Sequence, residues 1–159
     1  MKKFGVGFVP FRHAAKTLLA KANDGARELT STTDQSIVNK ARRDASLILP
    51  CQALFAFAAE LGLKAAVESL TAEKPHGHDL EKLFKMLPDD RASSFRTRFN
   101  DADFEQKLEK HSLNFHESRY FFEPREDDSN FEFDTPFMEK FVDTLLKEFA
   151  VEIQNSANG

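Results

Sequence analysis

The chain has 159 residues, which suits one domain with a hydrophobic core. Hydrophobic residues make up 41% and charged residues 30%, and the formal net charge of -4 repels nucleic acid, so any nucleic-acid site must be a local basic patch. The single cysteine, Cys51, excludes an internal disulfide and is predicted to be buried, because its segment is apolar. This cysteine usage fits a reducing cytoplasm. No apolar run has the length of a membrane span, so no membrane contact is expected.

The first ten residues are expected to be extended rather than helical. Residues 1–10 contain two glycines and a proline, which favour an arm that docks on the body or on a partner chain. Residues 11–154 are predicted to form a single helical-bundle domain. The polar residues 155–159 are predicted to be a flexible tail.

Apolar residues at helical spacing predict the elements of that domain. The segment from Cys51 to Leu70 is apolar on most sides, which is typical of the central helix of a bundle, and Pro50 fits its first turn. Gly62 within this helix predicts a close crossing by another helix. Further helices are expected at 11–22, ended by Gly25, at 36–49, 79–87 and 91–100, from about 103 to 122, and from 135 to about 153.

Residues 28–35 are polar and are predicted to be a loop. No strand pattern of any length appears in the sequence. The predicted fold class is therefore all-α, a compact up-and-down bundle of about five to seven helices.

A polar stripe borders one predicted helix at spacings of four, three and four, and it consists of Ser112, His116, Arg119 and Glu123. A half-buried arginine needs a carboxylate, and Glu60 in the most apolar helix needs a cation. We favour Arg119 as the partner of Glu60, because its planar fork matches a carboxylate in two places. Lys64, one turn after Glu60, is the alternative. The pair is expected to be structural, with a ligand-binding or catalytic role as the competing interpretation.

Two groups of residues resemble the HEPN family, small helical-bundle proteins of prokaryotic defence and toxin–antitoxin systems. The first runs from Ala59-Glu60-Leu61-Gly62-Leu63-Lys64 to Gly77-His78-Asp79-Leu80 and Leu83, and the second is Phe115 with Arg119-Tyr120-Phe121-Phe122-Glu123. The resemblance covers about residues 49–153. It implies an up-and-down helical bundle that commonly dimerises. The candidate polar network, structural or ligand-binding, consists of Glu60, Lys64, His78, Arg119, Tyr120 and Glu123.

Some members of that family are metal-independent ribonucleases, and others bind nucleotides or serve as partners of nucleotidyltransferases. The ribonucleases carry an arginine followed four to six residues later by a histidine, and no arginine of this chain has a histidine at that spacing. Here His116 instead precedes Arg119 by three residues. The two side chains could still form an acid–base or anion-binding face, so an atypical ribonuclease remains an alternative.

Three functions are consistent with the sequence. The favoured one is a non-catalytic, HEPN-like binding and dimerisation module in a defence or toxin–antitoxin setting. The alternatives are a metal-independent endoribonuclease that uses His116 and Arg119, and a bundle that binds a small ligand in a pocket among its phenylalanines. The expected partners are a second copy of the chain, a nucleotidyltransferase or other antitoxin, and RNA or a nucleotide.

No metal site and no cofactor are expected. The histidines, two of which flank Gly77, lack the spacing of three or four converging ligands. A small basic patch at Arg91, Arg96 and Arg98 could bind phosphate. Alternating basic and apolar residues are, however, more typical of an ordinary amphipathic helix.

Overall fold

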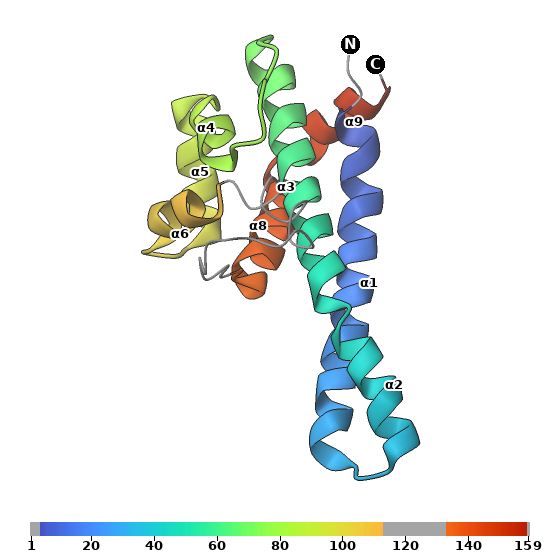
Figure 1. The fold of residues 1–159 in the computed structure, drawn as a ribbon. Helices are drawn as coiled ribbons and strands as arrows, with labels where there is room; N and C mark the ends of the chain where they lie inside the picture. Colours follow the sequence, from blue (N-terminus) through green and yellow to red (C-terminus); the bar gives the residue numbers. More distant parts are fainter. Residues whose placement is uncertain (1–3, 113–132, 159) are drawn as a thin grey trace, which may run out of the picture.

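The computed structural model describes residues 4–112 and 133–158, and within these residues every regular element is a helix (Figure 1). The predicted all-α helical bundle is therefore confirmed. The helices are α1 (Phe4–Ser31), α2 (Gln35–Ala45), α3 (Ile48–Thr71), α4 (Leu80–Lys85), α5 (Asp89–Phe99), α6 (Phe104–His111), α8 (Thr135–Glu148) and α9 (Ala150–Asn158).

The central element is α3, which packs against α1, α8, α9 and α4. Half of its residues are buried, including Cys51 and the rare charged pair Glu60 and Lys64. Pro50 lies in its first turn, where a missing N–H leaves no helical bond unmade. The close crossing predicted at Gly62 is confirmed, because an added Cβ there would lie 2.7 Å from the Phe8 ring of α1 and 3.2 Å from Leu145 of α8.

The segment 35–71 is long and apolar enough, by length and composition alone, to qualify as a membrane span. In the fold this segment is two helices, α2 and α3, joined by a short turn. The apolar composition of α3 is accounted for by the helices that surround it, as expected for the core helix of a bundle.

The prediction of an extended N-terminal arm is wrong, because a single helix runs from Phe4 to Ser31 and includes Pro10. Tertiary packing explains the difference. Gly5 lies against the backbone of α9, where a Cβ would come within 2.0 Å of the Ile153 carbonyl oxygen, and Phe8 is fully buried. Pro10 is exposed, so its ring does not disturb the packed face. The glycines therefore permit close helix contacts rather than break the helix.

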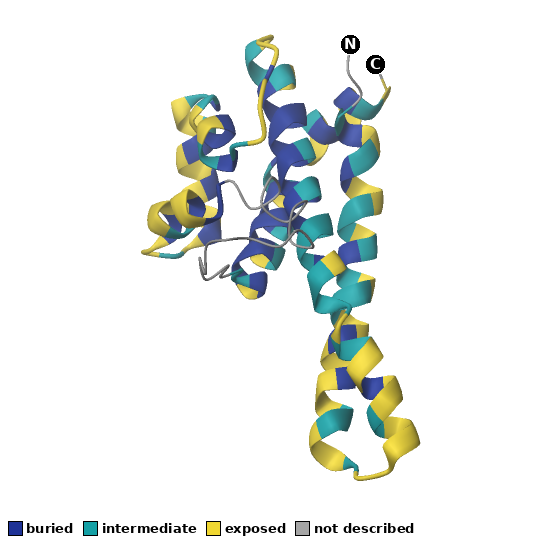
Figure 2. Cartoon of the chain, in the orientation of Figure 1, coloured by how far each residue is buried: buried dark blue, intermediate teal, exposed yellow. Residues whose placement is uncertain are grey.

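Gly25 also fails to end the first helix, which was predicted to stop there. A Cβ at Gly25 would lie 2.7 Å from the Ala41 carbonyl oxygen and from the Ala45 nitrogen, so the glycine allows α1 and α2 to pack closely. The C-terminal half of α1 and the whole of α2 form an antiparallel hairpin that extends beyond the other described helices (Figure 1). Most of its surface is exposed (Figure 2).

A cluster of phenylalanines joins α4, α5 and α6 to α8. Its rings lie 4.9–6.4 Å apart between centroids and belong to Phe84, Phe95, Phe99, Phe104, Phe137, Phe141 and Phe149. All seven side chains are buried. The phenylalanines of the C-terminal part of the chain, Phe137, Phe141 and Phe149, are therefore buried in the core of the same chain.

The last predicted helix is in fact two helices that meet at Phe149, whose backbone leaves the helical conformation at φ -121 and ψ 29. The second helix, α9, continues to Asn158, so the prediction of a flexible tail at 155–159 is wrong for the residues described. Ser156 is 5% exposed and accepts a hydrogen bond from the Gly5 N–H. That N–H is one of the first in α1 and has no partner within its own helix, so α9 supplies the cap that holds the tail in place.

Candidate functional site

The buried charged pair of α3 is the first candidate site. Glu60 and Lys64 are one turn apart, are 5% and 7% exposed, and form an ion pair of 2.6 Å between Oε1 and Nζ. The ammonium of Lys64 also lies 5.6 Å from the centre of the Phe4 ring. Both charges therefore have a partner, which is the condition for keeping them in an apolar environment.

The second oxygen of Glu60 contacts the loop before α4. Its Oε2 lies 2.9 Å from Nδ1 of His78, whose side chain is 46% exposed. The next residue, Asp79, accepts hydrogen bonds from the Lys82 N–H at 3.0 Å and from the Ser112 hydroxyl at 2.7 Å. Burial raises the pKa of Asp79, but these hydrogen bonds outweigh it and hold its pKa below the ordinary value. The network thus ties α3, α4 and the end of α6 together.

The remaining predicted members of the network, Arg119, Tyr120 and Glu123, lie outside the described residues, as does the catalytic candidate His116. Among the residues that are described, the partners of Glu60 are Lys64 and His78. Lys64, the alternative partner predicted for Glu60, therefore does contact it. The sequence signal for Lys64 is the spacing of four residues, which places two helical side chains side by side.

The basic patch on α5 is bound to carboxylates of the same chain. Arg91 pairs with Glu152 at 2.8 Å, and its guanidinium lies 5.1 Å from the centre of the Phe149 ring. Arg96 pairs with Glu105, and Arg98 pairs with Glu148 at 2.7 Å. These contacts fit the simpler prediction for this patch, an ordinary amphipathic helix that packs on its neighbours.

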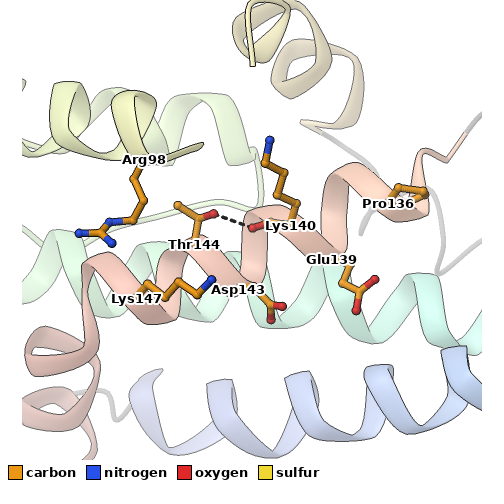
Figure 3. A pocket seen from close by; sticks show the side chains of 7 residues that line it. All are labelled: Arg98, Pro136, Glu139, Lys140, Asp143, Thr144 and Lys147. Atoms are coloured by element: carbon orange, nitrogen blue, oxygen red, sulfur yellow. Dashed lines mark hydrogen bonds between the residues drawn. The ribbon is translucent and has the colours of Figure 1, made fainter. Parts of the chain in front are cut away.

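A hollow on the outer face of α8 was not predicted. Its volume is about 360 Å³, and it is lined by Arg98, Pro136, Glu139, Lys140, Asp143, Thr144 and Lys147 (Figure 3). Six of these residues recur at helical spacing on α8, and Arg98 reaches them from α5. The sequence carried this polar stripe, but only the fold shows that Arg98 lies beside it.

Tertiary ion pairs fasten this face of α8 to α1. Asp143 accepts hydrogen bonds from Arg12 at 2.8 Å and from Lys16 at 2.7 Å, and Lys16 also lies 3.2 Å from Glu139. Burial raises the pKa of Asp143, but the bonds from Lys16 and Arg12 outweigh it, so that its pKa is below the ordinary value. The carboxylates that line the hollow are thus partly neutralised by α1.

Within residues 4–112 and 133–158, no group of three or more histidine, cysteine or acidic side chains is placed to hold a metal ion. Cys51 is fully buried, and burial raises the pKa of its thiol to about 12. A nucleophilic or metal-binding thiolate is therefore unfavourable at this position.

The fold and these sites define an all-α helical-bundle protein with a buried, internally satisfied polar network. No protein-family model matches the sequence, and the searches of curated proteins and of solved structures give no significant match.

Proposed function

We propose that this chain is a non-catalytic binding and dimerisation module, similar to HEPN proteins, that acts in a prokaryotic defence or toxin–antitoxin setting. The observation that supports a non-catalytic role is the engagement of Glu60, whose two carboxylate oxygens are both bound, one to Lys64 and the other to His78. A general acid or base needs an oxygen within reach of substrate. This carboxylate is instead 5% exposed and joins α3 to the loop before α4 through His78.

An RNA-cleavage assay tests this proposal. Purified wild-type chain and the variants His116→Ala and Arg119→Ala are incubated with total RNA in the presence of a chelator. We expect no cleavage above background from any of the three. Robust cleavage by the wild type that is lost in both variants, while both remain folded, would reject the binding module and support the ribonuclease alternative.

The apolar side chains of the last helix and of the N-terminal residues suggested from the sequence that a second copy covers them. Phe137, Phe141, Phe149 and Phe8 are instead buried in the core of the same chain. What remains exposed on α1 is Val6 at 52% and Val9 at 50%, three residues apart and therefore on one face. We propose this Val6–Val9 strip as part of the contact between two copies.

Light scattering at micromolar concentration measures the mass directly. A dimer is expected for the wild type, and a smaller average mass for Val6→Glu/Val9→Glu, whose changed side chains face away from the core. Deleting residues 1–10 is a poorer test, because it also removes the buried Phe8. A monomer mass for the wild type excludes the dimer.

A further inference from the structure

We propose that the hollow on α8 binds a small phosphorylated ligand through Arg98, Lys140 and Lys147. The ligand class is a diphosphate or a nucleoside phosphate, and the phosphate oxygens are the groups recognised. The proposal rests on the binding role proposed above and gives that role a site and a ligand class. The ligand site is tested by measuring ligand binding, and the proposed dimer is tested by measuring mass. Either proposal can therefore fail while the other stands.

The size of the hollow favours a small molecule. A volume of about 360 Å³ falls within the range of roughly 300–1,000 Å³ that is usual for small-ligand pockets. Figure 3 shows Arg98 descending from α5 towards α8, with Thr144 and Lys147 nearby and Lys140 extending back towards α5. The cations therefore come from two helices, and the Thr144 hydroxyl between them is already used in a hydrogen bond to the Lys140 carbonyl oxygen.

The charges around the hollow are unbalanced. Arg12, Lys16, Arg98, Lys140 and Lys147 supply five positive charges, and Glu139, Asp143 and Glu148 supply three negative ones. The result is a local excess of two positive charges on a chain whose formal net charge is -4. A compact anion is attracted here, whereas a long polyanion also meets the repulsion of the remaining surface.

The cations of the hollow also have donors to spare. Neither Lys140 nor Lys147 forms an ion pair with any residue in the described part of the chain, and the Lys140 ammonium lies 4.4 Å from the centre of the Phe99 ring. Arg98 donates its Nε–H to Glu148, and a guanidinium carries four further N–H donors. One fork-shaped donor group and two ammonium groups suit the tetrahedral oxygens of phosphate.

Isothermal titration calorimetry at low salt, with inorganic diphosphate and adenosine monophosphate as separate probes, tests the proposal. The wild type is expected to bind at least one of them saturably. Lys140→Gln/Lys147→Gln is expected to weaken that binding roughly tenfold or more. Thermal melts of both proteins check that the double variant is folded.

A matched control removes the same charge elsewhere. Arg43→Gln/Lys74→Gln changes two exposed cations that do not line the hollow, so it is expected to bind the probe like the wild type. Equal weakening in both double variants would reduce the effect to net charge and overturn the site. The absence of saturable binding by the wild type, up to millimolar concentrations of probe, would also overturn the site. Binding of an RNA oligonucleotide but of neither small probe would overturn the assigned ligand class.

Discussion

At the scale of single residues, the ion pair between Glu60 and Lys64 is the most sensitive point of the fold. Glu60→Ala removes the carboxylate partner of Lys64, a residue that is only 7% exposed. Removing one partner of a buried pair costs roughly 3–5 kcal/mol, and chemical denaturation of Glu60→Ala measures that loss. Glu60→Leu/Lys64→Met is expected to recover part of it, because neither remaining side chain carries a charge. A variant Glu60→Ala as stable as the wild type would show that water reaches this pair.

Cys51 gives a second test at the same scale. Its side chain is fully buried and burial raises its pKa to about 12, so the reactive thiolate is scarce at neutral pH. A thiol reagent such as 5,5′-dithiobis(2-nitrobenzoic acid) is expected to label the native chain very slowly and the chain unfolded in guanidinium rapidly. Fast labelling of the native chain would contradict the burial.

At the scale of elements, glycines set how closely the helices approach. Gly5→Ala places a Cβ 2.0 Å from the Ile153 carbonyl oxygen, so α1 and α9 must separate. Overpacking of this kind costs roughly 1–3 kcal/mol. Gly7→Ala is the matched control, because its Cβ meets side chains rather than backbone, the end of Leu61 at 2.7 Å and the Phe11 ring at 3.3 Å. Alanine also favours a helix over glycine by up to about 1 kcal/mol. Thermal melts should show a marked loss for Gly5→Ala and little change for Gly7→Ala; equal losses would argue against the backbone contact.

Because of the ion pairs between α1 and α8, the free energy of unfolding depends on pH in the acidic range. Although burial opposes ionisation of Asp143, hydrogen bonds from Lys16 and Arg12 lower its pKa below the ordinary 3.8. A carboxylate with a lowered folded pKa contributes fully above its unfolded pKa, and its contribution is lost as pH falls through the folded pKa. Between about pH 5 and pH 2, the wild type should therefore lose more unfolding free energy than Asp143→Asn. Parallel pH profiles for the two proteins would contradict this.

At the scale of the whole molecule, the elements with strong apolar periodicity could be predicted from the sequence. The central position of α3, the burial of Cys51 and the close crossing at Gly62 all followed from such patterns. The helical state of residues 4–10 did not, because Gly5 and Pro10 disfavour a helix locally. That preference is offset by contacts with α9 and with Leu61 and Gly62 of α3, more than fifty residues away in the chain.

The candidate sites were predictable to different degrees for the same reason. A spacing of four residues on one helix was enough to pair Glu60 with Lys64, whereas the contact with His78 depends on how the loop before α4 returns to α3. The hollow on α8 needed the position of Arg98, which lies 38 residues before the first α8 residue that lines the hollow. Such contacts are decided by tertiary packing, for which one sequence carries no local signal.

We expect the hairpin of α1 and α2 to unfold separately from the rest of the described helices. Its contact surface buries small residues, Ala22, Gly25 and Ala41, while Ile37 remains 41% exposed. So little apolar burial cannot hold the hairpin as firmly as the phenylalanine cluster holds the body, and segments of this kind open at a fraction of the global free energy. Amide hydrogens of α2 should exchange with deuterium while those of α3 stay protected. Among the residues that the structure describes, a protease should cut first near residues 32–34. Exchange of both helices in one global event would show instead that the hairpin and the body are a single cooperative unit.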